Sequence, residues 1–167
     1  ELYIMKVIFL DIDGVLNSNF WNDTHQREIS DGTLIDEEKV MLLGQLIRNT
    51  SAKVILHSGW KFWFDSEVKP LRREAERLIS MLEKEGIKVN GVTPDHTTEE
   101  IRKSKKFSLV KASEILAWVS QYANIEKWIV IDDLDLHNEE IRKHQILTDA
   151  SIGLTVENIC EAERLLL

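Results

Sequence analysis

Lys6-Val7-Ile8-Phe9-Leu10-Asp11-Ile12-Asp13-Gly14 is the stretch that decides the fold of this chain. The apolar run ending at Leu10 is typical of a strand buried on both faces, as in a parallel sheet covered by helices. Two aspartates follow at once, and Gly14 then permits an immediate turn that brings Asp13 above the rim of the sheet. The sequence therefore predicts a buried parallel strand with carboxylates at its carboxyl end.

Short apolar runs alternate with longer amphipathic segments along the rest of the chain, which is the pattern of βα units on a parallel sheet. We expect further strands at 53–56, 87–89, 128–131 and 145–147, and helices at 36–49, 66–85, 109–122 and after Thr155. Leu71 and Ile79 are expected in the buried stripe of the second helix. These elements predict a three-layer, Rossmann-like α/β fold with helices on both faces of the sheet.

The length of 167 residues fits one domain, which we assign to 1–167. The polar segment at about 17–34 has no helical period and is interpreted as a flap. Neither this flap nor the stretch before Lys111 is long enough for a substantial cap domain. An open site of this kind favours larger substrates or a lid from another subunit.

Composition narrows the functional classes. The net charge of -8 argues against a general nucleic-acid binder, which needs a basic surface to replace phosphate counterions. Cys160 is the single cysteine, so no disulfide forms within the chain and a reducing cytoplasm is the expected compartment. No apolar run approaches the ~20 residues of a membrane span.

Acidic and polar residues follow the predicted strands. Asp132-Asp133 comes after the strand at 128–131, Ser58 follows the strand at 53–56, and Lys111 lies near the start of the third predicted helix. Ligands of open α/β sheets bind outside the carboxyl ends of the strands, so we expect these groups to converge with Asp11 on one rim.

The type of metal follows from the donors. Crowded carboxylates are driven towards protonation unless a cation lies among them. A cluster of oxygen ligands, with no cysteine nearby and no histidine at ligand spacing, favours a hard cation. Mg²⁺ fits best, because it takes one or two carboxylates and fills its remaining positions with water and substrate phosphate.

At these residues the chain resembles the haloacid dehalogenase-like (HAD) phosphohydrolases. The run from Val7 to Asn17 is similar to the first motif of that superfamily, while Ser58, Lys111 and Asp132-Asp133 stand at its second, third and fourth motifs. A narrower resemblance links the chain to the small capless HAD domains of "Swiss Army knife" RNA-repair proteins. It rests on these segments: Ser58-Gly59-Trp60, Thr93-Pro94-Asp95, Lys111 to Trp118, Asp132-Asp133, and Asp149 with Gly153-Leu154-Thr155.

Two departures concern the narrower resemblance. Relatives often carry a second Ser or a Thr where Gly59 stands, and Arg-Gly where Lys111-Ala112 stands. These differences leave the hydrolase interpretation intact and weaken the inheritance of an RNA substrate.

The HAD resemblance implies a two-step phosphatase reaction. Asp11 attacks phosphorus to give an aspartyl-phosphate, which water then hydrolyses. Asp13 acts as the acid and base, and its backbone carbonyl joins Asp11 and Asp132 around Mg²⁺. Asp133 is either a further ligand of Mg²⁺ or a residue that holds another ligand in position. Ser58 binds a phosphoryl oxygen, and Lys111 balances the charge of the transition state, although spacing alone does not distinguish Lys111 from the other basic residues of 102–106.

Aromatic residues cluster just past the second strand, at Trp60, Phe62, Trp63 and Phe64. Two interpretations remain open for them: core packing, and a wall or stacking face for a substrate ring beside Gly59 and Trp60. Phe20 and Trp21 in the flap are candidates for substrate contact. His57 adjoins the site, where a packed histidine is favoured over a catalytic one.

Several functions are compatible with these residues. We expect a Mg²⁺-dependent phosphatase acting on a phosphorylated small molecule or nucleotide. The alternatives are a nucleic-acid 3′-end phosphatase, which the net charge does not support, and a catalytically silent domain that binds phospho-ligands. A signalling receiver domain is disfavoured, because the predicted third strand is followed by Asn90-Gly91 and no aspartate until Asp95.

Overall fold

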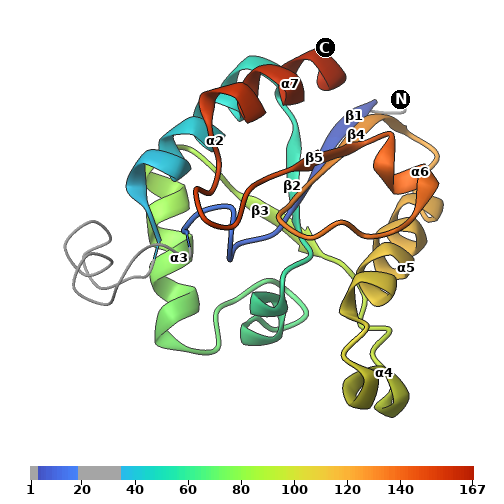
Figure 1. The fold of residues 1–167 in the computed structure, drawn as a ribbon. Coiled ribbons are helices and arrows are strands. Elements are labelled where there is room, and N and C mark those ends of the chain that lie inside the picture. Colours follow the sequence, from blue (N-terminus) through green and yellow to red (C-terminus); the bar gives the residue numbers. More distant parts are fainter. Residues whose placement is uncertain (1–3, 19–34) are drawn as a thin grey trace.

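The computed structural model describes residues 4–18 and 35–167. Its centre is a five-stranded parallel sheet in the order β3-β2-β1-β4-β5, with helices on both faces (Figure 1). The strands are β1 Met5–Leu10, β2 Lys53–Leu56, β3 Val89–Val92, β4 Ile125–Asp132 and β5 Gln145–Leu147. The helices are α2 Glu37–Thr50, the 3₁₀ turn η1 Gly59–Trp63, α3 Arg73–Lys84, α4 Glu99–Ser104, α5 Phe107–Ser120, α6 Glu139–Arg142 and α7 Val156–Leu166. The predicted three-layer α/β fold is confirmed.

The central strand supplies side chains to two separate cores. Ile8 and Leu10 pack with residues of α2, α3 and α7, while Val7 and Phe9 pack with residues of α5 and α6. Alternate residues of a strand point to opposite faces, so a continuous apolar run is what a strand covered on both sides requires. The buried run predicted from the sequence is therefore explained by helices on both faces of β1 (Figure 1).

The second helix is shorter than the sequence suggested. It was expected from residue 66, but α3 begins at Arg73. The Asp65 carboxylate accepts hydrogen bonds from the backbone N–H groups of Glu67 and Lys69, which favours a turn over a helix. Pro70 also disfavours helical backbone in the residue before it. Leu71, expected in the buried stripe, is consequently 64 % exposed.

The strand order places a topological switch beside β1. The chain moves outward from β1 to β2 and β3, and then returns to place β4 on the other side of β1. Ligand crevices of open α/β sheets lie at such a switch, here between β1 and β4. The order also differs from the 2-1-3-4-5 arrangement of receiver-type folds, and this excludes the receiver interpretation.

The predicted flap and cap can be compared with the structure only in part. Residues 19–34, and with them Phe20 and Trp21, lie outside the described residues. Between β3 and α5 the described chain holds only the short helix α4. None of the described helices combines the length and apolar character needed to cross a membrane.

Candidate active site

The register of the sheet brings the strand ends level with one another. Leu10 pairs with Leu56 on one side and with Ile131 on the other. The next residues along these strands, Asp11, His57 and Asp132, therefore meet at the switch point. Asp11 donates its N–H to the Ile131 carbonyl at 3.0 Å, and His57 donates its N–H to the Leu10 carbonyl at 3.1 Å.

Side-chain alternation directs the acidic strand ends to the face covered by α5. Val7 and Phe9 of β1 belong to that core, and Asp11 continues the same alternation. Trp128 and Val130 of β4 do likewise and are continued by Asp132. The carboxylates at the ends of β1 and β4 are thereby brought together on the α5 side of the sheet.

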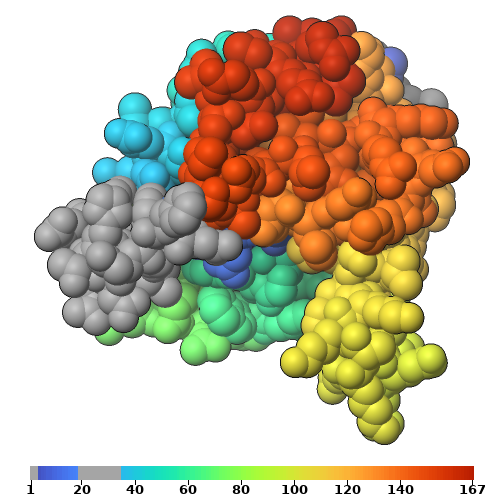
Figure 2. Space-filling model, in the orientation of Figure 1, coloured from blue at the N-terminus to red at the C-terminus, as the bar shows by residue number. Residues whose placement is uncertain are grey.

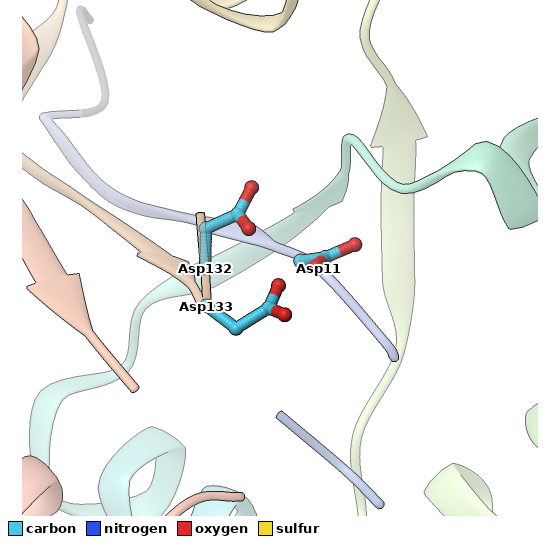
Figure 3. A group of neighbouring side chains, drawn as sticks. All are labelled: Asp11, Asp132 and Asp133. Atoms are coloured by element: carbon cyan, nitrogen blue, oxygen red, sulfur yellow. The ribbon is translucent and has the colours of Figure 1, made fainter. Parts of the chain in front are cut away.

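Asp11, Asp132 and Asp133 form a compact carboxylate cluster (Figure 3). Each offers an oxygen, and these oxygens lie within 4.8 Å of one another. Asp11 and Asp132 are buried, whereas Asp133 is partly exposed. Burial raises the pKa of Asp11 well above its usual value, and the charge of Asp132 raises it further. Burial likewise raises the pKa of Asp132, against the opposing charge of Lys111.

Lys111 supplies positive charge to this cluster. Its Nζ donates a hydrogen bond to Asp132 Oδ2 at 2.9 Å and lies 3.5 Å from Asp11 Oδ1. Burial by itself lowers the pKa of Lys111, but the charges of Asp11 and Asp132 outweigh that effect and raise it. The ammonium is therefore retained among the carboxylates.

The position of Lys111 on its helix explains why it reaches the cluster. It lies one turn before Ile115 and two turns before Trp118, both of which pack against the sheet. Lys111 thus extends the buried stripe of α5 towards the strand ends. By contrast, four other basic residues of this region are exposed: Arg102, Lys103, Lys105 and Lys106.

Gly14 allows the β1 and β4 loops to approach closely. Its φ is +80°, and a Cβ atom there would lie 2.5 Å from Asp133 Cγ. A side chain at this position would therefore displace Asp133 from the cluster. The Gly14 carbonyl accepts a hydrogen bond from Thr148 Oγ1 at 2.8 Å, which ties this loop to the segment after β5.

Asp13 is held beside the cluster and is exposed to solvent. Its Oδ1 accepts a hydrogen bond from Asn17 Nδ2 at 3.0 Å, and its Oδ2 accepts one from Trp60 Nε1 at 3.1 Å. Its carboxylate is not among the three that form the cluster. The side chain of Asp13 is thus fixed in orientation and remains reachable from outside.

Ser58 and Gly59 begin η1, at the carboxyl end of β2. Ser58 is buried, and its Oγ accepts a hydrogen bond from the Trp60 N–H at 3.2 Å. That bond uses Oγ as an acceptor, so its O–H remains able to donate. Gly59 is exposed, and a Cβ atom there would meet nothing within 4 Å.

The structure separates the aromatic residues into two groups. Trp60 and Phe64 are each 6 % exposed and belong to the core, and Trp60 packs on Trp63 with ring centroids 4.8 Å apart. The buried ring of Trp60 leaves its indole N–H as the part directed to the site. Phe62 alone of the four is strongly exposed, at 54 %.

A protein-family profile described as the HAD domain in Swiss Army Knife RNA repair proteins matches residues 7–159. The match covers most of the chain and includes all three residues of the carboxylate cluster. The chain belongs to this family of HAD domains. Among curated proteins, none matches the sequence. Family membership makes the chain a HAD-type hydrolase domain, and its carboxylate cluster lies where the fold forms a ligand crevice.

Two further buried groups of this HAD domain carry ionisable side chains. The sequence predicted His57 to be a packed histidine beside the site, whereas the second group was not identified from the sequence. His57 is 1 % exposed, and its Nε2 lies 3.5 Å from Asp132 Oδ2. Burial lowers the pKa of His57 well below its usual value, and Lys111 adds to the effect, so the ring is neutral. The burial of His57 agrees with the packed histidine that was predicted from its position directly after β2.

The second group is an ion pair between Lys61 and Glu114, at 2.9 Å. Lys61 Nζ also donates to Thr93 Oγ1 at 3.2 Å and to the Pro94 carbonyl at 2.9 Å. Glu114 Oε2 accepts a hydrogen bond from the His96 N–H at 2.9 Å. This network joins η1, the segment after β3 and α5, and no local sequence pattern indicates it.

Proposed function

We propose that this HAD domain is a Mg²⁺-dependent phosphatase that transfers the phosphoryl group of a monoester to Asp11. The observation that carries the proposal is the placement of the Asp11 carboxylate at the switch point. There it lies beside two further carboxylates and 3.5 Å from the Lys111 ammonium. A nucleophile flanked by a cation-binding group and a fixed positive charge is what phosphoryl transfer requires.

The residues present fit a magnesium ion. Asp11, Asp132 and Asp133 offer only oxygen donors, and Asp11 and Asp132 are buried, where a cation would offset the cost of holding their negative charge. When bound, Mg²⁺ would neutralise charge on the phosphoryl oxygens. We assign Asp11 and Asp132 as ligands and propose that Asp133 is a third. The family resemblance implies that the Asp13 backbone carbonyl is a further ligand, and we include it in the proposal.

The first step forms a bond between an Asp11 carboxylate oxygen and phosphorus while the ester P–O bond breaks. Asp13 donates a proton to the leaving oxygen, so the product is a neutral alcohol. In the second step water attacks phosphorus, the bond to Asp11 breaks, and Asp13 accepts the proton of the water. The sum is monoester plus water giving alcohol plus inorganic phosphate.

The remaining residues orient the phosphoryl group and balance its charge. The Ser58 O–H is free to donate to a phosphoryl oxygen, because its Oγ is used only as an acceptor within η1. Lys111 opposes the negative charge of the equatorial oxygens. Trp60 and Asn17 hold the Asp13 carboxylate in one orientation, which preserves the geometry needed for proton transfer.

Hydrolysis of p-nitrophenyl phosphate tests this function. Wild type and Asp11→Asn are compared with Mg²⁺ and with EDTA. We expect turnover that needs Mg²⁺ and is abolished by the substitution, whereas Asp149→Asn, an exposed acidic residue on the segment after β5, retains activity. Equal background hydrolysis by wild type and Asp11→Asn would contradict a general phosphatase. Binding of beryllium fluoride with Mg²⁺ would then separate a selective enzyme from a silent phospho-ligand binding domain.

A second candidate is a phosphatase for nucleic-acid ends. It is favoured by the family description, which refers to RNA repair proteins, and opposed by the net charge of -8. The two candidates differ in their preferred substrate. A nucleic-acid end phosphatase would hydrolyse a 3′-phosphorylated oligonucleotide with a much higher kcat/KM than a nucleoside monophosphate, and added salt would reduce that preference.

A further inference from the structure

A cavity of about 520 Å³ opens beside the carboxylate cluster. Its walls come from η1, α4, α5 and the loop after β4. Gly59, His57 and Lys111 belong both to this cavity and to the candidate active site. A group joined to a phosphate at Asp11 therefore has a direct path into the cavity. The volume lies within the range of pockets that hold small ligands, ~300–1,000 Å³.

Three large apolar side chains, two of them aromatic, line the cavity beside its polar and charged groups. Phe62 is 54 % exposed, Phe107 is 44 % exposed and Leu134 is 40 % exposed, and all three line the space. Large apolar side chains left open to solvent around a concave site indicate a ligand that covers them. Figure 2 shows α4 and the start of α5 standing away from the body of the molecule. That projection supplies the outer wall, including Phe107.

The charged groups of the cavity are of two kinds. Lys61 and Glu114 neutralise each other at its base, with Lys61 Nζ also 5.5 Å from the centroid of the Phe62 ring. Arg102 is exposed on the wall formed by α4. A flat ring between phenylalanine side chains and a guanidinium gains stacking and cation–π contacts that a saturated group does not.

We infer that this cavity binds the leaving group of the substrate and selects monoesters whose leaving group carries a planar aromatic ring. The inference rests on the proposed phosphatase activity for the position of the phosphate. Phe62 and Phe107 are the residues that determine this specificity. They touch the leaving group and take no part in bond breaking.

The test compares two monoesters that differ in ring type. Benzyl phosphate and cyclohexylmethyl phosphate have leaving groups of similar size and basicity, but only the first is flat and aromatic. We expect wild type to prefer benzyl phosphate in kcat/KM, and Phe62→Ala and Phe107→Ala each to reduce that preference about three- to tenfold. Hydrolysis of methyl phosphate should change less than twofold.

Leu109→Ala is the matched control, because Leu109 is on the same helix as Phe107 and is 50 % exposed, but is not part of the cavity wall. It should leave the preference unchanged. Equal rates for the two esters, or equal effects of Leu109→Ala and Phe107→Ala, would overturn the inference.

A calorimetric experiment separates the proposed phosphatase activity from the inferred ring preference of the cavity. It measures the binding of two non-hydrolysable ligands, benzylphosphonate and cyclohexylmethylphosphonate, in the presence of Mg²⁺. Absence of hydrolysis together with tighter binding of benzylphosphonate that Phe107→Ala abolishes would contradict the phosphatase and support the aromatic cavity. Hydrolysis without any ring preference in rate or binding would support the phosphatase and contradict the cavity.

Discussion

Asp11 combines burial with close negative neighbours, and both raise its pKa. In the metal-free protein, the folded state holds this proton more tightly than the unfolded chain does, where the pKa is about 3.9. Wild type therefore loses stability from this group as the pH rises from about 4 through the raised pKa. Asp11→Asn carries no such proton. We expect its free energy of unfolding in EDTA to increase relative to wild type over that range and then to level off.

Urea unfolding at a series of pH values measures this difference. Asp149→Asn is the control of opposite sign, because hydrogen bonds from Ser151 lower the pKa of Asp149. Its carboxylate stabilises the fold above the unfolded-state pKa, and this contribution is lost as the pH falls through the lowered folded-state pKa. Parallel stability curves for wild type and Asp11→Asn would contradict the electrostatic account of the cluster.

The indole of Trp60 is expected to act through Asp13. Trp60→Phe keeps a buried ring and removes the hydrogen bond of 3.1 Å to Asp13 Oδ2. We predict that kcat for an alkyl phosphate falls about tenfold, the equivalent of roughly 1.5 kcal/mol for a hydrogen bond to a charged group. The first step with p-nitrophenyl phosphate should change less, since nitrophenolate leaves without a proton. Trp63→Phe is the control, and an equal effect from it would indicate a packing defect.

At the scale of an element, α5 carries the charge that balances the site. Lys111→Met should reduce kcat about 10²–10³-fold, the size of effect seen when one transition-state donor is removed. Lys106→Met changes an exposed lysine just before the same helix and should alter kcat less than twofold. Steady-state kinetics at saturating Mg²⁺, with melting temperatures to verify folding, provides the measurement. Equal losses from both variants would show that Lys111 contributes only general positive charge.

The ion pair between Lys61 and Glu114 joins α5 to η1. Both side chains are less than a tenth exposed, so removing one partner leaves a buried charge. Glu114→Ala should lower the free energy of unfolding by about 3–5 kcal/mol. The double variant Lys61→Met/Glu114→Leu should recover much of this loss, because neither charge remains. Urea unfolding decides the matter, and additive losses in the double variant would contradict the pairing.

For the whole molecule, the fold could be predicted because local and global signals agree. The buried run of β1 requires helices on both faces, and β2 and β5 lie at the predicted residues. Asp36 and Thr155 cap α2 and α7 through side-chain hydrogen bonds, as residues of these types do. The predicted helix was wrong at 66–72, because hydrogen bonds to the Asp65 carboxylate form a turn there instead.

The candidate site was predictable where it follows from strand order and less so where it depends on packing. Asp11, Asp132 and Asp133 converge because parallel strands end at the same edge. The local sequence does not reveal that Trp60 is buried and Phe62 exposed. Their environments differ because the 3₁₀ turn η1 directs the two side chains to different sides. The cavity wall at Phe107 likewise depends on how α4 and α5 project from the sheet.

Direct detection of a phosphoryl group on Asp11 tests whether this residue is the nucleophile. Asp13→Asn is mixed with p-nitrophenyl phosphate and Mg²⁺, quenched in acid, and its peptides are analysed by mass spectrometry. This substrate needs little acid catalysis in the first step, whereas the variant lacks the base for the second, so the aspartyl-phosphate should accumulate. We expect one phosphoryl group on Asp11, absent with EDTA and absent from Asp11→Asn/Asp13→Asn. Release of nitrophenol by Asp13→Asn with no phosphoryl group on Asp11, or with one on another residue, would contradict it.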